Sequence, residues 1–190
     1  MTSLVPDSRS LPAESSLGSS LVDSQMFCTA WEASHANIFR YVSSRVGSSA
    51  AEDLVSAVLT CAFARRASFD PRKSPNGSAL PWFLGIATKE IARHRECERR
   101  WLDQQLASAR NSPIDVGEPA DAINGISVRP RLATALKSLK KRDRDAFLLF
   151  VLADLTYEDV AAALGVPIGT VRSRIGRARE RMAAMMRAEQ

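Results

Sequence analysis

The chain has 190 residues, a formal net charge of +5 and 45% apolar residues, but only 6% aromatic residues. This length suits one ordinary domain or two small ones, and so few rings favour short helices over a β-sandwich. Three widely spaced cysteines argue against a disulfide framework, and no apolar run is long enough to cross a membrane. Because the N-terminus also lacks the pattern of a secretory signal, we expect a cytoplasmic protein.

The chain begins with a Ser-rich tail and continues with helical patterns. Residues 1–24 show no sustained period, so a disordered tail is expected there. Apolar residues recur with helical spacing over 26–46, and Gly47 suits the end of that helix. A second helix is expected over 51–66, with acidic residues on its first turn.

A loop, a third helix and a linker follow. Residues 67–81 are rich in Pro, Gly and Ser, and a third helix is expected over 82–101, with Trp82 at the start of its apolar stripe. Residues 102–130 have little periodicity. Between positions 103 and 128 there are four acidic residues and one basic residue, so a flexible acidic linker is predicted. The first domain is therefore predicted over 25–101.

The last block, 131–190, has the pattern of a helix-turn-helix domain. Thr156 and Asp159 have the spacing of a capping box at the start of a short helix. Gly165 is expected to end that helix, and Pro167 is placed to open the next one. No strand pattern is found, so the predicted fold class is all-α, with two small helical domains joined by a linker.

The helix after Pro167 has an amphipathic pattern that indicates DNA binding. At 100° per residue, Val171, Ile175 and Ala178 share the side that faces a core. The opposite side consists of Ser173, Gly176, Arg177 and the acid Glu180, flanked by Arg172, Arg174, Arg179 and Arg181. Arginine can bind guanine with two hydrogen bonds in a major groove, while its neighbours bind phosphates. One acid cannot neutralise five arginines, so an ordinary salt-bridged surface helix explains the pattern less well.

Several strings of residues carry a family resemblance. GTVRSRIGRAR at 169–179 resembles the promoter-reading helix of the extracytoplasmic-function (ECF) sigma factors of bacterial RNA polymerase. LTYEDVA at 155–161, followed by LGVP at 164–167, resembles the helix and turn before it. AEDLV at 51–55 resembles the polymerase-docking helix of that family, and WFLGIA at 82–87 resembles the opening of its next conserved helix. The order of these strings identifies the chain as a member.

The resemblance implies a non-enzymatic subunit that gives RNA polymerase its choice of promoter. A sigma region 2-like first domain would dock on the clamp coiled coil of the largest polymerase subunit and recognise the −10 element. A sigma region 4-like second domain would read the −35 element and lie at the flap region. A cognate anti-sigma factor is an expected partner, whereas no cofactor, metal, membrane or small-molecule substrate is expected.

By position, the resemblance also assigns residues to each task. Polymerase docking would fall to Glu52, Asp53, Leu54 and Val55. Capture of unstacked −10 bases would fall to the loop and the helix after it, through Phe69, Asn76, Lys89, Arg93 and Arg95. Duplex −35 DNA would be read through Arg172, Ser173, Gly176 and Arg177, with Thr170 and Arg174 as backbone contacts. Lys89 stands where the family often has Asn, which predicts an unusual −10 preference.

Other functions and sites were weighed against this one. A stand-alone helix-turn-helix regulator would bind operators without polymerase, and a helical interaction protein would sequester a partner. His94 and Cys97 lie one helical turn apart, but a structural zinc site needs four ligands and no second pair is near. His35 falls on the apolar stripe of the first helix and is expected to be buried. Transcription that depends on core polymerase would separate the three functions.

Overall fold

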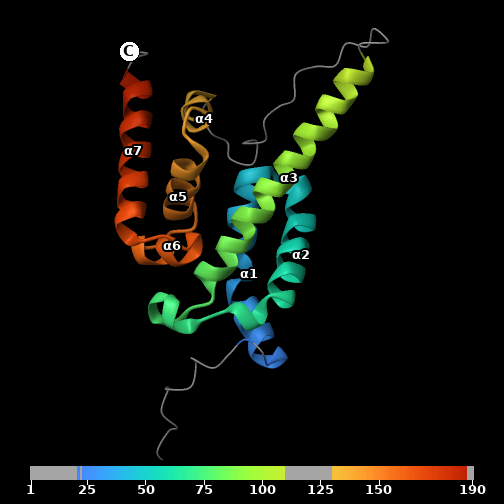
Figure 1. Ribbon diagram of the computed structural model, residues 1–190, viewed down its shortest axis with the longest axis vertical. Coiled ribbons are helices and arrows are strands. Elements are labelled where there is room, and N and C mark those ends of the chain that lie inside the picture. The colour runs from blue at the N-terminus through green and yellow to red at the C-terminus, as the bar shows by residue number, and fades with distance from the viewer. Residues whose placement is uncertain (1–20, 22, 110–129, 188–190) are drawn as a thin grey trace, which may run out of the picture.

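The computed structural model describes residue 21, residues 23–109 and residues 130–187. Within these ranges every regular element is a helix, and the predicted all-α fold is confirmed. Three helices form a first module, and four helices form a second module beside it (Figure 1). Among the residues that the structure describes, none of the helices combines the length and the apolar character that a bilayer span requires.

The first module consists of three helices that pack on one another. Asp23 caps the first of them by accepting a hydrogen bond from the Gln25 backbone N–H at 2.8 Å. Gly47, with φ of 84°, separates the first two helices, because this left-handed backbone angle suits glycine. The helices are α1 (Ser24–Val46), α2 (Ser48–Ala64) and α3 (Leu80–Ala109).

Two of these helix bounds differ from those expected. Helix α2 begins at Ser48, so its acids Glu52 and Asp53 lie in the second turn and not in the first. Helix α3 continues beyond Trp101 to Ala109, into the range expected to be linker. Figure 1 shows the C-terminal half of α3 extending past the other helices of its module. The predicted linker residues 110–129 and tail residues 1–20 lie outside the described residues.

The core of the first module is formed by apolar side chains of α1, α2 and α3. Its largest fully buried side chains include Phe27, Tyr41 and Phe83. Leu21 belongs to the same cluster, so the chain just before α1 is packed against the core. The prediction that His35 is buried is wrong. His35 is exposed, and its neighbour Ser34 is buried in its place.

The second module consists of α4 (Pro130–Lys137), α5 (Lys141–Leu152), α6 (Tyr157–Leu164) and α7 (Ile168–Arg187). The predicted capping box is present: Thr156 accepts from the Asp159 backbone N–H at 3.1 Å, and Asp159 accepts from the Thr156 backbone N–H at 3.2 Å. Gly165 ends α6 in the left-handed conformation, with φ of 63°. These features confirm the predicted helix, turn and second helix.

The two modules are in direct contact. Helix α3 of the first packs against α6 of the second, and α1 packs against α5. Gly85 lies at the closest approach, because a Cβ atom placed there would overlap the carbonyl oxygen of Ala163. Buried apolar side chains of both modules form one connected cluster.

Candidate nucleic-acid interface

Helix α7 presents a basic face to solvent and an apolar face to α4, α5 and α6. Val171, Ile175 and Ala178 are completely buried, as the helical wheel predicted. The candidate −35 residues lie on the remaining surface of the helix. Arg172, Ser173 and Arg177 are exposed, whereas Thr170, Arg174 and Gly176 are half-buried. A Cβ atom at Gly176 would meet no neighbour within 4 Å, so the backbone is accessible there. The fold thus brings all six predicted residues onto one helix.

Arg177 is held by a carboxylate of α5. Its Nη2 and Nε atoms donate to Asp143 at 2.8 Å and 3.3 Å, and Asp143 is buried. This hydrogen bond raises the pKa of Arg177 above its ordinary value. The Arg177 side chain is still 56% exposed, and the two bonds to Asp143 do not use its Nη1 atom. Asp143 therefore orients a candidate base-reading arginine, a role that sequence reasoning missed.

A second arginine of α7 is held by aromatic rings. The rings of Phe150 and Tyr157 stack with centroids 5.1 Å apart, and the Arg179 guanidinium lies 5.1 Å from the Phe150 centroid. A cation over a ring face is attracted by its quadrupole, which keeps the long arginine side chain in place. The sequence carries no short-range signal for this cluster, because its members come from three different helices.

The segment between α2 and α3, predicted as a loop, forms three single helical turns. They are η1 (Arg66–Ser68), η2 (Pro71–Lys73) and η3 (Pro75–Gly77). Phe69 and Trp82 pack together there with ring centroids 5.7 Å apart, and both rings are half-buried. Trp82, expected in the core, therefore leaves part of its ring accessible, while Phe83 beside it is fully buried.

Asp70 caps the second of these turns, η2. It accepts hydrogen bonds at 3.1 Å from both the Arg72 backbone N–H and the Arg72 Nε. These bonds lower the pKa of Asp70 below its ordinary value. Asn76, predicted to contact −10 bases, lies in η3, and its side chain is outside the described part of the structure. The half-buried aromatic pair Phe69–Trp82 and the turns beside it thus form a candidate platform for an unstacked base.

The three candidate basic residues of α3 have different surroundings. Lys89 is exposed, and among the described residues no ion pair is found for it. Arg93 pairs with Glu90 on the same helix at 2.8 Å. Arg95 donates to the backbone carbonyl of Arg45 at 2.8 Å and so contributes to the packing of α1 on α3. His94 lies 3.1 Å from Glu98, and within the described ranges no group of three potential metal ligands is found.

The four candidate docking residues fall into two pairs. Glu52 and Asp53 are exposed on α2, where their carboxylates are accessible to a partner. Leu54 and Val55 are each only 6% exposed and pack in the core of the first module. The acids can therefore contact a partner directly, whereas the two apolar residues hold the helix that presents them.

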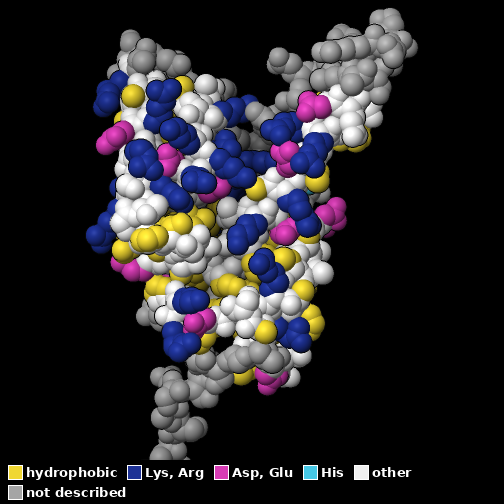
Figure 2. Space-filling view, in the orientation of Figure 1, with side chains coloured by type: hydrophobic (Ala, Val, Ile, Leu, Met, Phe, Trp, Pro, Cys, Tyr) yellow, Lys and Arg dark blue, Asp and Glu magenta, His cyan; other side chains and the backbone are white. Residues whose placement is uncertain are grey.

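Basic side chains gather on one face of the molecule. Figure 2 shows Lys and Arg along α7, across the middle of the molecule and onto α3, where acidic side chains lie among them. A surface of this charge can attract the phosphates of nucleic acids.

Comparison with known proteins agrees with this geometry. The family model described as sigma-70, region 4 matches residues 129–182. The ECF RNA polymerase sigma factor SigC of Mycobacterium tuberculosis is 33% identical over 155 residues, which cover 80% of this chain and 79% of that protein. The ECF RNA polymerase sigma factor EcfG of Rhodopseudomonas palustris is 30% identical over 138 residues, covering 72% and 71% of the two chains.

Solved structures share the fold at low sequence identity. CnrH, solved in complex with the cytosolic domain of CnrY, superposes with a TM-score of 0.58 at 18% identity. The match covers 88% of this chain and 92% of the CnrH chain. The sigma factor RpoE of Bartonella quintana, in complex with the anti-sigma factor NepR, gives a TM-score of 0.54 at 24% identity, with coverage of 86% and 98%. With a relative one-third identical along most of both sequences, the chain belongs to the ECF RNA polymerase sigma factors.

Proposed function

We propose that this sigma factor binds core RNA polymerase in the cytoplasm, recognises −35 and −10 promoter elements, assists promoter opening and starts transcription of a specific set of genes. The observation that carries the proposal is the exposed, arginine-rich face of α7 on a helix-turn-helix in a chain of this family. The protein acts as a specificity subunit, and the polymerase supplies the catalysis.

The two modules would divide promoter recognition between them. The first, over 25–101, would hold the −10 element, and the second, over 131–190, would read the −35 element, with 102–130 as the linker. Intact duplex offers a groove of helix width, which suits the regular face of α7. Opened DNA offers free base faces, which suit the Phe69–Trp82 pair, while Lys89 tracks the phosphates.

Core polymerase and an anti-sigma factor are the proposed protein partners. The exposed acids Glu52 and Asp53 would bind the clamp coiled coil of the largest subunit, and the second module would lie at the flap region. The RpoE neighbour was solved in complex with the anti-sigma factor NepR, which supports a partner of the same kind for this chain.

A run-off assay with purified core polymerase tests the function. We expect transcripts only when both the protein and core polymerase are present, and only from templates with matching −35 and −10 elements. Operator binding by the protein alone, without any effect on core polymerase, would support the stand-alone regulator. If the protein bound neither core polymerase nor DNA, the proposal would be wrong.

A further inference from the structure

We infer that the small pocket between the two modules is a binding site for a small anion that carries a phosphate group, held by Arg45, Arg95 and Arg144. The three arginines lie on three different helices, α1, α3 and α5, and only the folded chain brings them together. The site goes beyond promoter recognition and does not depend on it, because its ligand binds without DNA. It is carried by three converging cations, a pocket wall that lacks acids, and two buried donors.

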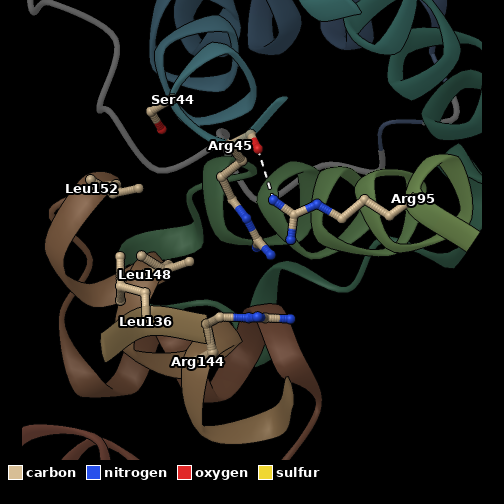
Figure 3. Close-up of a pocket in the computed structure, with 7 residues that line it drawn as sticks. All are labelled: Ser44, Arg45, Arg95, Leu136, Arg144, Leu148 and Leu152. Carbon is tan, nitrogen blue, oxygen red and sulfur yellow. Dashed lines mark hydrogen bonds between the residues drawn. The ribbon is translucent and has the colours of Figure 1, made fainter. Parts of the chain in front are cut away.

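The pocket is lined by cations and apolar side chains. Figure 3 shows the side chains of Arg45, Arg95 and Arg144 extending into the same space from different sides. The rest of the wall consists of Ser44 and three leucines of the second module, Leu136, Leu148 and Leu152. None of the seven lining residues is an acid, so the wall carries positive charge alone. Apolar surroundings lower the local dielectric constant, which strengthens the attraction between these cations and an anion.

Arg45 is buried and only partly satisfied. It is 4% exposed, its Nη2 lies 2.9 Å from Asp145 Oδ1, and its Nη1 donates to the Tyr41 hydroxyl at 2.7 Å. Burial by itself would lower the pKa of Arg45, but Tyr41 and Asp145 hold it above its ordinary value, so the group stays charged. Its Nε is buried and has no hydrogen-bond partner among the described residues. A buried N–H group of this kind favours a ligand that supplies an acceptor.

Arg144 has a charge that its surroundings do not balance. It lies between two aspartates that pair elsewhere, because Asp143 binds Arg177 at 2.8 Å and Asp145 binds Arg45 at 2.9 Å. Within the described ranges no ion pair is found for Arg144, and its Nε is buried without a hydrogen-bond partner there. Arg144 is half-buried, so it has lost part of its hydration without gaining a carboxylate. An anion in the pocket would neutralise it.

Arg95 completes the site from α3. Its Nη2 donates to the backbone carbonyl of Arg45 at 2.8 Å, and this bond holds its side chain at the pocket (Figure 3). The carbonyl is a neutral acceptor, so this bond orients the guanidinium without cancelling its charge. The candidate site thus receives one guanidinium from each of three helices.

A phosphate group suits this arrangement better than a carboxylate does. Guanidinium groups bind phosphate oxygens with parallel hydrogen bonds, and a phosphomonoester offers three such oxygens and nearly two negative charges. The cavity volume is about 10 Å³, which is room for one water-sized group, so one phosphate oxygen can enter while the others stay at the mouth. Because Arg45 is so deeply buried, the backbone of a DNA duplex cannot reach it.

Titration of the full-length protein with inorganic phosphate tests the site. Calorimetry at slightly alkaline pH and constant ionic strength, with chloride as the balancing anion, separates a specific site from general screening. We expect saturable binding, which Arg144→Gln should weaken at least about tenfold, the loss expected for one charge-assisted hydrogen bond. Arg142→Gln removes the same charge from an exposed position of α5 outside the pocket and should change the affinity by less than about twofold.

A second pair of variants separates loss of the site from loss of folding. Ser44→Asp places a carboxylate in the pocket wall and should abolish phosphate binding, because that carboxylate neutralises the arginines. Ser44→Asn has nearly the same shape without the charge and should bind phosphate like the unchanged protein. Thermal unfolding without phosphate identifies any variant that is not folded.

Adenosine monophosphate and adenosine identify the source of the phosphate group. Binding of the monophosphate but not of adenosine, at least as tightly as inorganic phosphate, would support a phosphorylated small molecule as ligand. Binding of inorganic phosphate alone would support free phosphate. Displacement of phosphate by a DNA duplex without terminal phosphates would assign these arginines to the DNA backbone and overturn the inference.

Three other results would also overturn it. They are the absence of saturable phosphate binding, an equal loss in Arg144→Gln and Arg142→Gln, and equal binding by Ser44→Asp and Ser44→Asn. Because the titrations contain neither polymerase nor a promoter, their outcome is separate from that of the run-off assay.

Discussion

Replacement of Arg177 by alanine is the most informative change in the candidate −35 surface. The side-on edge of its guanidinium, Nε and Nη2, is already bound to Asp143 at 3.3 Å and 2.8 Å. The end-on edge, Nη1 and the second N–H of Nη2, is not used by these two bonds, and more than half of the side chain is exposed. That edge has the two parallel donors needed for guanine O6 and N7.

The expected loss follows from this geometry. One bidentate contact to a base discriminates by about five- to 150-fold, so Arg177→Ala should weaken binding of the holoenzyme to −35-dependent promoters within that range. Arg177→Lys should lose nearly as much, because an ammonium group cannot bind the carboxylate and the base edge with one planar fork. Asp143→Asn should have a smaller effect, because it removes the orientation of Arg177 and leaves the base-reading group.

Competition binding at one fixed salt concentration measures these affinities, because phosphate contacts make every value salt-dependent. Arg187→Ala is the control, since this exposed arginine lies at the end of α7 away from the predicted reading face. Thermal unfolding of each variant confirms that the second module is folded. Equal affinities for Arg177→Ala and the unchanged protein would refute the base-reading role of Arg177.

Three further predictions concern the other surfaces. Asp53→Lys reverses an exposed charge on the proposed docking face and should reduce capture of core polymerase at least about tenfold, whereas Glu32→Lys on α1 should not; equal co-purification would remove the assignment. Lys89→Asn should change the preferred −10 bases in a promoter selection, and an identical profile would show that Lys89 does not contact them. Thr156→Ala removes the cap of α6 and should lower the free energy of unfolding by about 1 kcal/mol in a denaturant titration; an unchanged midpoint would contradict the role of the capping box.

Local sequence signals predicted the helix-turn-helix with good accuracy. The capping box at Thr156, the left-handed Gly165 and the buried positions Val171 and Ile175 are all present as expected. Each of these features depends on residues within one or two helical turns, so short-range spacing is sufficient to predict it.

Features that depend on how helices pack were not predicted. Arg177 and Asp143 are separated by 34 positions, and Arg45 and Asp145 by 100, so neither pair has a local signature. The prediction that His35 is buried was wrong, because His35 lies at the edge of the apolar stripe of α1. A helical wheel places a residue on a side of the helix, but it does not show how far the neighbouring helices cover that side. The role of Gly85 depends on α6 of the other module and can be seen only in the folded chain.

In vitro transcription from a library of random promoters, with core polymerase and this protein, tests the central claim most directly. The account predicts protein-dependent transcripts whose start sites lie downstream of two enriched elements near −35 and −10. It also predicts that Arg177→Ala reduces the enrichment at the upstream element alone, because the two modules contact separate elements. Transcripts that do not depend on the protein, or an enriched sequence with a single element, would contradict it.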